Sequence, residues 1–423
     1  MSLLDQLSDK STWEAYEKYK ASLALPKADT KALRDLISQE AYLPAVRRIL
    51  SGEAFPLPKR AVISKQSNRK KRVVYTYPPL ENTVLKVLTY LTLRKYDYLF
   101  DPGLYSFRPG RTAKDAIRYL VRTPGIWQMY AYKADISNYF NSIPVEKLLP
   151  KLQEALEDDP VLYQFDAALL SEPYVLTDAE SIDESRDAFP DREGEYLVYD
   201  GKHYRVVKES KGIMAGTPLS AFYANLYLRE VDHYFFEKQI PYARYSDDII
   251  LFAPTREELQ KHVADLHRFL REAGLQINPS KESISAPGDA WIFLGFSLQN
   301  GVIDIAPANI QKLKDKMRRK TRALARWKKR NGIEGEKAAK AFIRIFNKKL
   351  LEAPDSDHEL SWSHWFFPVI NTSEGLRQID HYAQDCIRYL VQGTRTKARY
   401  RTSYQDLKKL GYRSLVHEYY QDI

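Results

Sequence analysis

Two adjacent acids inside a strand-forming segment constrain this chain more than any other feature. In PYARYSDDIILFA (241–253), Asp247 and Asp248 lie between Tyr-Ser and the apolar run Ile-Ile-Leu-Phe. Successive side chains of a strand point to opposite faces, so two acids in mid-strand would bury an unpaired carboxylate. A tight turn lets both point outward, and Asp favours turns. The segment therefore predicts strand, turn and strand, and the simplest interpretation is a turn with two solvated acids.

A third acid, Asp135, ends another strand-like run, AYKADIS (131–137). A carboxylate at a strand end beside an acidic turn can bind two Mg²⁺ ions, which activate a 3′-hydroxyl and stabilise a leaving pyrophosphate. Taken alone, Asp135 is explained equally well as a cap on the segment that follows.

Periodicity and turn residues predict the other elements. The chain is expected to form short helices over 1–55, a strand at 72–78, helices at 80–100 and from Pro144, a hairpin at 195–207, a helix at 217–233 with Thr217 as N-cap, a helix at 255–274, a strand at 291–298 and mainly helix after 307. The acidic stretch 154–195 lacks periodicity and is expected to be an insertion, partly loop.

Length and composition narrow the class of protein. The 423 residues, 44% of them hydrophobic, suffice for two or three packed units. No run of about 18 apolar residues predicts a membrane span, and the N-terminus lacks a signal-peptide core. The single cysteine, Cys386, excludes an intrachain disulfide and a Cys-rich zinc module. Both exclusions favour a cytoplasmic location.

Charge is distributed unevenly along the chain. Residues 311–330 hold eleven Lys/Arg and one Asp, a net +10 that equals the net charge of the whole chain. Residues 154–195 hold fourteen Asp/Glu and two Arg. The basic segment carries charge all round a helix, so it does not look like a simple amphipathic core helix. Phosphate neutralisation is its natural interpretation, and a solvated helix the alternative.

Seven blocks, in order, resemble the reverse transcriptase family. Asp-x₄-Phe (Asp135, Phe140) and Tyr-Ser-Asp-Asp (245–248) look like motifs A and C. The remaining blocks are KKRVVYTYPPLENTVLKVL (70–88) and YSFRPGRTAKDAI (105–117) of the fingers, GIMAGTPLSAFYANLYL (212–228) of motif B, GLQINPSK (274–281) of motif D and FLGF (293–296) of motif E. The resemblance implies an α+β right-hand polymerase with a basic helical thumb.

The resemblance also implies roles at the matching positions. Asp135, Asp247, Asp248 and the carbonyl of Ile136 would bind two Mg²⁺ ions, and Lys281 would act as a proton donor. Lys71, Arg72 and Arg108 would hold the triphosphate of a dNTP, and Phe140, Gly216 and Ser220 would line the nucleotide. For Lys71, Arg72, Arg108 and Lys281, solvated surface charge is the alternative. In the basic segment, RNA would contact Arg318, Arg319, Lys320, Arg322, Arg326, Lys328, Lys329 and Arg330.

Three sequence differences separate this chain from the common family pattern. One is the long segment between motifs A and B, which contains the acidic stretch and the expected hairpin. Ser246 replaces the usual Ala of motif C, which is a small change. Met214-Ala215-Gly216 replaces the usual Pro-Gln-Gly of motif B, so a polar contact to the nucleotide or template is missing. This loss leaves template-independent DNA synthesis open as an alternative function.

The domain prediction is an N-terminal helical extension (1–60), fingers (61–130), a palm (131–300) with an insertion near 150–211, and a thumb with RNA-binding capacity (301–423). The tail LKKLGYRSLVHEYY (407–420) resembles bacterial unknown-group and defence-associated enzymes, class 2 in particular. That resemblance implies a structured noncoding RNA template, a cDNA product and antiphage defence. A further alternative is an RNA-binding or splicing protein without catalysis, although crowded carboxylates argue against it. The oligomeric state is left open.

Overall fold

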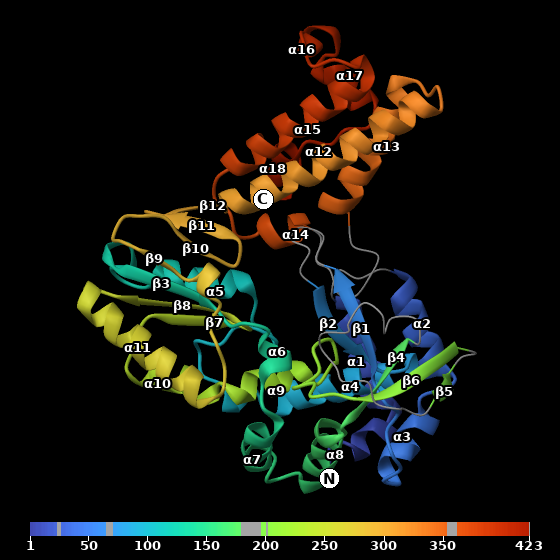
Figure 1. Cartoon of the computed structure of the whole chain (residues 1–423), viewed down its shortest axis with the longest axis vertical. Helices are drawn as coiled ribbons and strands as arrows, with labels where there is room; N and C mark the ends of the chain where they lie inside the picture. The colour runs from blue at the N-terminus through green and yellow to red at the C-terminus, as the bar shows by residue number, and fades with distance from the viewer. Residues whose placement is uncertain (23–26, 65–70, 179–195, 200–201, 353–361, 423) are drawn as a thin grey trace. The chain divides into compact units, whose positions relative to one another are not determined.

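The computed structural model describes residues 1–22, 27–64, 71–178, 196–199, 202–352 and 362–422. The chain forms two compact units, one of residues 1–20 and 32–284 and the other of 21–31 and 285–423. Helices and strands both contribute, as the α+β prediction requires (Figure 1). Within the described residues, no helix combines the length and apolarity needed to span a membrane.

Helices are the commonest regular element in the described chain before residue 273. They are α1 (Lys10–Ser22), α2 (Lys27–Ser38), α3 (Leu43–Leu50), α4 (Pro79–Lys95), α5 (Ala113–Arg122), α6 (Tyr139–Ser142), α7 (Val145–Ala155), α8 (Pro160–Ser171), α9 (Ser220–Tyr227), α10 (Arg229–Glu237) and α11 (Arg256–Glu272). Local sequence explains several starts. Thr112 and Asp115 form a capping box at α5, and the Thr255 hydroxyl accepts from the Glu258 N–H at α11.

A four-stranded sheet carries the predicted acids. Its order is β7 (Tyr242–Tyr245), β8 (Asp248–Ala253), β3 (Tyr130–Asp135) and β9 (Ser283–Ser285), and α10 and α11 lie beside it (Figure 1). In this sheet, β7, β8 and β3 pair antiparallel. Residues 249–253 of β8 are all buried, which explains their continuous apolar run. The predicted strand, turn and strand over 241–253 is confirmed.

The acidic stretch is not simply an insertion into this sheet. Its first part forms α8 and β4 (Tyr174–Asp178), and residues 179–195 lie outside the described residues. The expected hairpin is confirmed as β5 (Tyr196–Tyr199) and β6 (Lys202–Lys208). These strands join β1 (Lys59–Ser64) and β2 (Lys71–Thr76) in a five-stranded sheet of order β2-β1-β4-β6-β5. The prediction of an insertion missed this pairing because its partner strands precede it by about a hundred residues.

Two other local predictions were wrong. The helix expected at 217–233 is two helices that meet at Leu228, and α9 begins at Ser220. Thr217 is not its N-cap, because its hydroxyl donates to the Met214 carbonyl at 2.9 Å. The strand expected at 291–298 is a hairpin of β10 (Trp291–Phe293) and β11 (Phe296–Gln299). Leu294 and Gly295 both have positive φ, the backbone of a two-residue hairpin turn.

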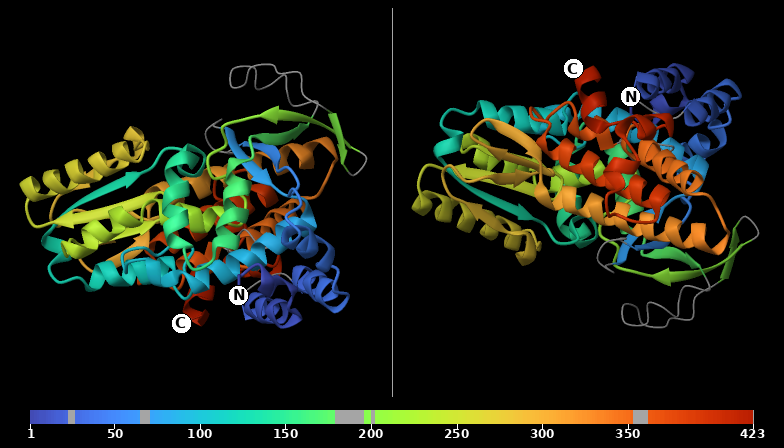
Figure 2. Two further views of the ribbon diagram at one scale, coloured as in Figure 1. Left: turned by 90° about the horizontal axis from the view of Figure 1, so that it is seen from below. Right: turned by 90° about the horizontal axis from the view of Figure 1, so that it is seen from above.

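The second unit is mainly helical. Beyond β12 (Val302–Ile305) it contains α12 (Pro307–Arg330), α13 (Gly335–Leu350), α14 (Trp362–Phe366), α15 (Glu374–Gln392), α16 (Ala398–Arg401), α17 (Tyr404–Lys409) and α18 (Leu415–Asp422). Figure 2 shows α12, α13 and α15 side by side, as their mutual contacts require. Contrary to expectation, α12 is amphipathic: Ile310, Met317, Thr321 and Leu324 form one buried stripe.

Candidate active site

Strand pairing brings the three predicted acids together. Asp135, the last residue of β3, is the direct Cα partner of Asp248, the first residue of β8. Asp247 precedes it in the turn, and its carbonyl accepts from the N–H of Ile136 at 3.0 Å. Asp135 is buried, and Asp247 and Asp248 are half-buried. The two strand ends therefore hold the three residues at one edge of the sheet.

Two lysines neutralise part of this acidic cluster. The Lys281 ammonium lies 2.5 Å from Oδ2 of Asp135, and the Lys133 ammonium 3.1 Å from Oδ1 of Asp248. The pKa of Asp247 is raised, first by burial and then by the negative charges of Asp135 and Asp248. Lys281 of motif D thus contacts Asp135, and its role as a proton donor stays a prediction.

The donor set fits a divalent cation of the kind that reverse transcriptases use. Carboxylate oxygens are the ligands that hard cations prefer, and the repulsion that raises the pKa of Asp247 would be relieved by a bound cation. In the part of the chain that the structure describes, no three Asp, Glu, His or Cys side chains converge closely enough to hold a metal ion as they lie. A cation would compete with Lys281 and Lys133 for Asp135 and Asp248.

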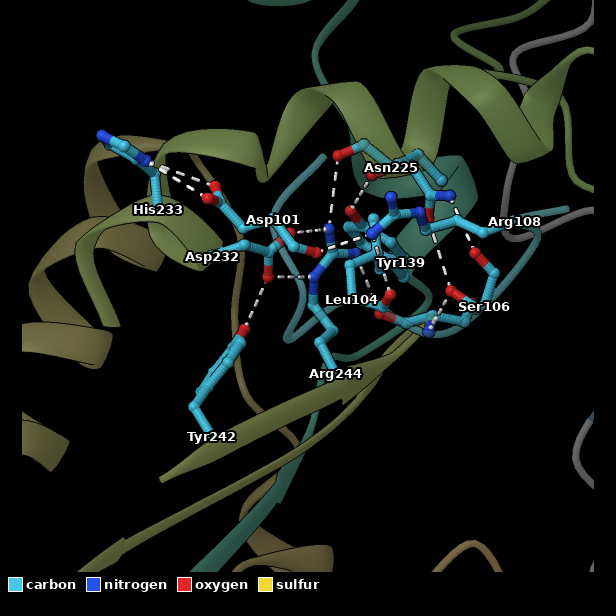
Figure 3. Close-up of polar contacts among 12 residues, drawn as sticks. Asp101, Leu104, Ser106, Arg108, Tyr139, Asn225, Asp232, His233, Tyr242 and Arg244 are labelled. Atoms are coloured by element: carbon cyan, nitrogen blue, oxygen red, sulfur yellow. Dashed lines mark hydrogen bonds and ion pairs between the residues drawn. The ribbon is translucent and has the colours of Figure 1, made fainter. Parts of the chain in front are cut away.

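A buried ion pair lies next to the acidic turn and contacts it. Arg244, fully buried in β7, donates through Nε to Oδ1 of Asp232 at 2.8 Å, and the Tyr242 hydroxyl donates to the same oxygen (Figure 3). Burial alone would lower the pKa of Arg244, but Asp232 raises it above the usual value. Removing one partner of such a pair would leave an uncompensated buried charge.

This ion pair is linked directly to the turn. Arg244 donates to the carbonyls of Asn225 (Figure 3) and Ser246. The Ser246 N–H donates to the Ser106 hydroxyl at 2.8 Å. Ser246 has a φ of +61°, a strained value for a residue other than Gly. Sequence analysis missed Arg244 and Asp232, although a charged residue inside the apolar stretch before the turn was a visible signal.

Asn141 is a second residue that the sequence analysis missed. Its side-chain amide donates to the Val73 carbonyl of β2 at 3.1 Å and accepts from the Ala215 N–H at 3.0 Å. A Cβ on Gly212 would lie 2.7 Å from the Asn141 carbonyl oxygen, so motif B can approach this closely only with glycine there. Asn141 therefore joins motif A, motif B and β2.

The predicted nucleotide-lining residues differ in their placement. Phe140 is half-buried, and its ring meets that of Phe107 edge to face, with 6.2 Å between centroids. Gly216 is exposed at a φ of +102°, and a Cβ there would lie 3.0 Å from the Tyr75 carbonyl. Ser220 is buried, and its hydroxyl donates to the Thr217 carbonyl at 2.6 Å. Ser220 is therefore better explained as a helix-start contact than as a nucleotide ligand.

Of the three predicted triphosphate ligands, Arg108 is bonded to protein groups. Its guanidinium is buried, pairs with the Asp97 carboxylate at 2.7 Å and donates to the carbonyls of Asp97, Asp101 and Leu104. These contacts occupy its donors, so Arg108 is a structural residue in this arrangement. Arg72 is exposed on β2 and stays a candidate. The side chain of Lys71 lies outside the described residues.

The second unit carries the predicted nucleic-acid ligands. Arg319, Lys320, Arg322, Arg326, Lys329 and Arg330 are exposed on α12. Arg318 is also exposed and pairs with Asp315 at 2.9 Å. Lys328 differs, because it is half-buried and its ammonium donates to the Leu390 carbonyl at 3.0 Å, near the end of α15. Lys328 thus satisfies a helix-terminal carbonyl, and its predicted role toward nucleic acid is not supported by this contact.

The family model described as reverse transcriptase (RNA-dependent DNA polymerase) matches residues 63–298. A comparison with curated proteins gives no significant match.

The similar solved structures include three structures of telomerase from two Candida species. Apo telomerase from Candida tropicalis is 12% identical, with a TM-score of 0.47, over 84% of this chain and 59% of that chain. The same telomerase truncated from its C-terminal domain is 11% identical, with a TM-score of 0.44, over 59% and 54%. Telomerase from Candida albicans with a TWJ fragment of telomeric RNA is 11% identical, with a TM-score of 0.42, over 92% and 69%. This chain thus spans little more than half of the truncated telomerase.

Proposed function

Because the chain belongs to the reverse transcriptase family and carries the RNA-directed DNA polymerase domain of these nucleotidyltransferases, we propose that it synthesises DNA from dNTPs on a dedicated noncoding RNA. The observation that carries this proposal is the pairing of Asp135 with Asp248 across two strands, with Asp247 and Lys281 beside them. A protein that only binds RNA has no need of three crowded acids, because their repulsion costs stability.

In the proposed reaction, Asp135, Asp247, Asp248 and the carbonyl of Ile136 would hold two Mg²⁺ ions. When bound, the ions lower the pKa of the attacking 3′-hydroxyl and stabilise charge on the leaving pyrophosphate. The chain's own residues supply the geometry. The Arg244–Asp232 pair fixes the turn of motif C, and Asn141 fixes motif B against β2.

Three further residues have proposed roles around the nucleotide. Arg72, exposed on β2, would contact the triphosphate. The half-buried Phe140 ring, backed by Phe107, would lie against the sugar. Lys281, already paired with Asp135, would hold a proton near the pyrophosphate.

The proposed biological role is antiphage defence with a structured RNA partner. It is supported by the resemblance of the tail at 407–420, whose residues surround one buried carboxylate. Asp380 accepts from the Tyr412 and Ser414 hydroxyls and from the N–H groups of Leu415 and Val416. The family-like tail is thus part of the folded second unit and not an appendage to it.

The decisive experiment is to purify the chain with its co-purifying RNA, supply dNTPs and Mg²⁺, and sequence both RNA and DNA. We expect DNA complementary to one co-purified RNA species. DNA unrelated to any RNA present would establish template-independent synthesis, the alternative that Met214-Ala215-Gly216 leaves open. RNA without DNA, across primers and metals, would indicate a binding protein.

A further inference from the structure

A second basic surface lies in the last part of the chain, apart from α12. Residues 393–413 hold seven Lys/Arg and one Asp, a net charge of +6. The tyrosine at its centre, Tyr400, is 91% exposed, against 74% for Tyr98 and 61% for Tyr420. Tyr400 stands between Arg399 and Arg401, both exposed. The balanced charge outside 311–330 had concealed this cluster, because acids elsewhere offset it.

The backbone of this segment is anchored, so its exposed side chains are held in place. Ala398 and Thr402 are buried. Arg388 of α15 donates to the Thr402 carbonyl at 3.1 Å, and Gln392 donates to the Thr402 hydroxyl at 2.7 Å. The next helix, α17, begins with a capping box. Display of an aromatic ring from an anchored segment lowers the entropy lost when a ligand binds.

Part of the positive charge around Tyr400 is uncompensated. Within the described chain, Lys397 and Arg401 form no ion pair, whereas Arg399 shares Asp385 with Arg388, Lys409 interacts with Asp406, and Arg413 pairs with Glu418. The one acid of the segment, Asp406, is occupied by the N–H and hydroxyl of Ser403. A ligand with regularly spaced negative charges would therefore find few competing acids here.

The end of α12 lies close to the end of α15, the helix that precedes this segment. Lys328 donates to the Leu390 carbonyl, and Gly335, which begins α13, is close to the backbone of Val391. The last turn of α12, with Lys329 and Arg330, thus lies at the same end of the helical unit as the segment that follows α15. Figure 1 shows α16 and α17 at this end.

We propose that Tyr400 and the basic residues beside it form a binding site for single-stranded nucleic acid. A nucleobase stacks on the Tyr400 ring, and Lys397 and Arg401 contact phosphates. Aromatic rings on a basic surface bind single strands because every base presents a stacking face. A duplex, whose bases are already stacked, would use the charges but not the ring. The site extends the proposed function and does not require it, because binding needs neither dNTPs nor metal.

The test measures binding of the purified full chain in EDTA without dNTPs. The probes are a fluorescein-labelled 20-nucleotide single-stranded RNA, the same DNA sequence and a blunt duplex, read by fluorescence anisotropy. Stacking energies of single bases on aromatic rings lead us to expect roughly tenfold weaker single-strand binding for Tyr400→Ala. Duplex binding should change less than about twofold, because the charges remain.

Two variants complete the comparison. Tyr400→Phe should bind single strands like the parent chain, because it keeps the ring, and Tyr420→Ala is the matched removal of another exposed tyrosine. Melting temperatures confirm that each variant is folded. They should not change, because the Tyr400 ring is exposed and contributes little to stability. Single-strand binding of Tyr400→Ala within twofold of the parent overturns the site, and so does an equal loss on single strands and duplex. Neither result depends on polymerase activity, so failure here is distinguishable from failure of the proposed function.

Discussion

The acidic cluster of the first unit and the basic helix α12 of the second differ in what surrounds their charges. Asp135, Asp247 and Asp248 lie buried or half-buried at adjacent strand ends, each within reach of another charge. On α12, seven of the eight predicted ligands are exposed, with one buried apolar stripe beneath them. The first set interacts at short range with little water between, while the second set is screened by solvent and salt.

This contrast predicts how each region responds to mutation. A change among the carboxylates should act strongly and locally, because geometry and neighbouring charge are fixed by the sheet. A change on α12 should act weakly, in proportion to the charges removed, and should depend on salt.

Removing one carboxylate should nearly abolish DNA synthesis. We expect Asp247→Asn, and separately Asp135→Asn, to lower the rate of dNTP incorporation roughly a thousandfold or more, because cation binding supplies several kcal/mol of transition-state stabilisation. RNA affinity should stay within about twofold. The measurement is single-turnover primer extension beside RNA binding. Asp315→Asn on α12 is the control, and full activity in either site variant would refute the assignment.

The choice of sugar should depend on Phe140. If its ring lies under the ribose, a 2′-hydroxyl meets an apolar wall without a hydrogen-bond partner, a cost of about 1–3 kcal/mol. We therefore expect Phe140→Ala to lower the preference for a dNTP over its matching rNTP by roughly 10- to 100-fold. Phe107→Ala, which removes the edge-to-face neighbour, should lower it less. The measurement is the ratio of kcat/KM values, and an unchanged ratio in active Phe140→Ala would place sugar selection elsewhere.

Neutralising exposed Lys and Arg side chains on α12 should weaken RNA binding in proportion to the number of charges removed. For the triple variant Arg326→Gln, Lys329→Gln and Arg330→Gln, each lost phosphate contact should lower the slope of log affinity against log salt by roughly 0.7–0.9. Salt titrations of RNA binding measure this slope. The matched control neutralises Arg256, Lys261 and Arg271, which are exposed on α11. Equal slopes for the two triples would show that α12 is a solvated face.

A buried carboxylate away from the site should affect stability alone. Burial raises the pKa of Asp166, in α8, to about 8, although the nearby Tyr223 hydroxyl opposes the rise. Between the unfolded value near 3.9 and this folded value, the folded chain binds a proton that the unfolded chain has released, so stability falls as pH rises. The contribution approaches about 1.4 kcal/mol per pH unit.

Asp166→Asn should remove this part of the pH dependence. Urea unfolding at pH 5, 6, 7 and 8 measures it, and the exposed Asp289→Asn serves as control. Parallel pH profiles for the parent and Asp166→Asn would show that Asp166 is not protonated in the folded chain. RNA binding and dNTP incorporation at pH 7 should stay within about twofold of the parent values.

Local chemistry in the sequence was enough for part of this protein. The acidic turn and the hairpin at 195–207 could be predicted from turn residues and from the alternation of apolar and polar residues. The mainly helical second unit and the order of the family blocks could be predicted from the short spacings between residues. The amphipathic stripe of α12 was also present in the sequence, but its abundant charge concealed it. The errors at 217–233 and 291–298 arose where backbone conformation at one or two residues, Leu228 in one case and Leu294 with Gly295 in the other, divided a continuous apolar pattern.

What the tertiary structure alone decided is the partner of each charged or polar side chain. Lys281 reaches Asp135 across 146 positions, and Asn141 bonds Val73 and Ala215 across 68 and 74. Arg108 and Lys328 looked like free cations in the sequence, yet one is buried against Asp97 and the other bonds the Leu390 carbonyl. A charged residue has the same sequence signal whether its partner is water, protein or nucleic acid. Only packing determines how much water it loses and which group replaces it.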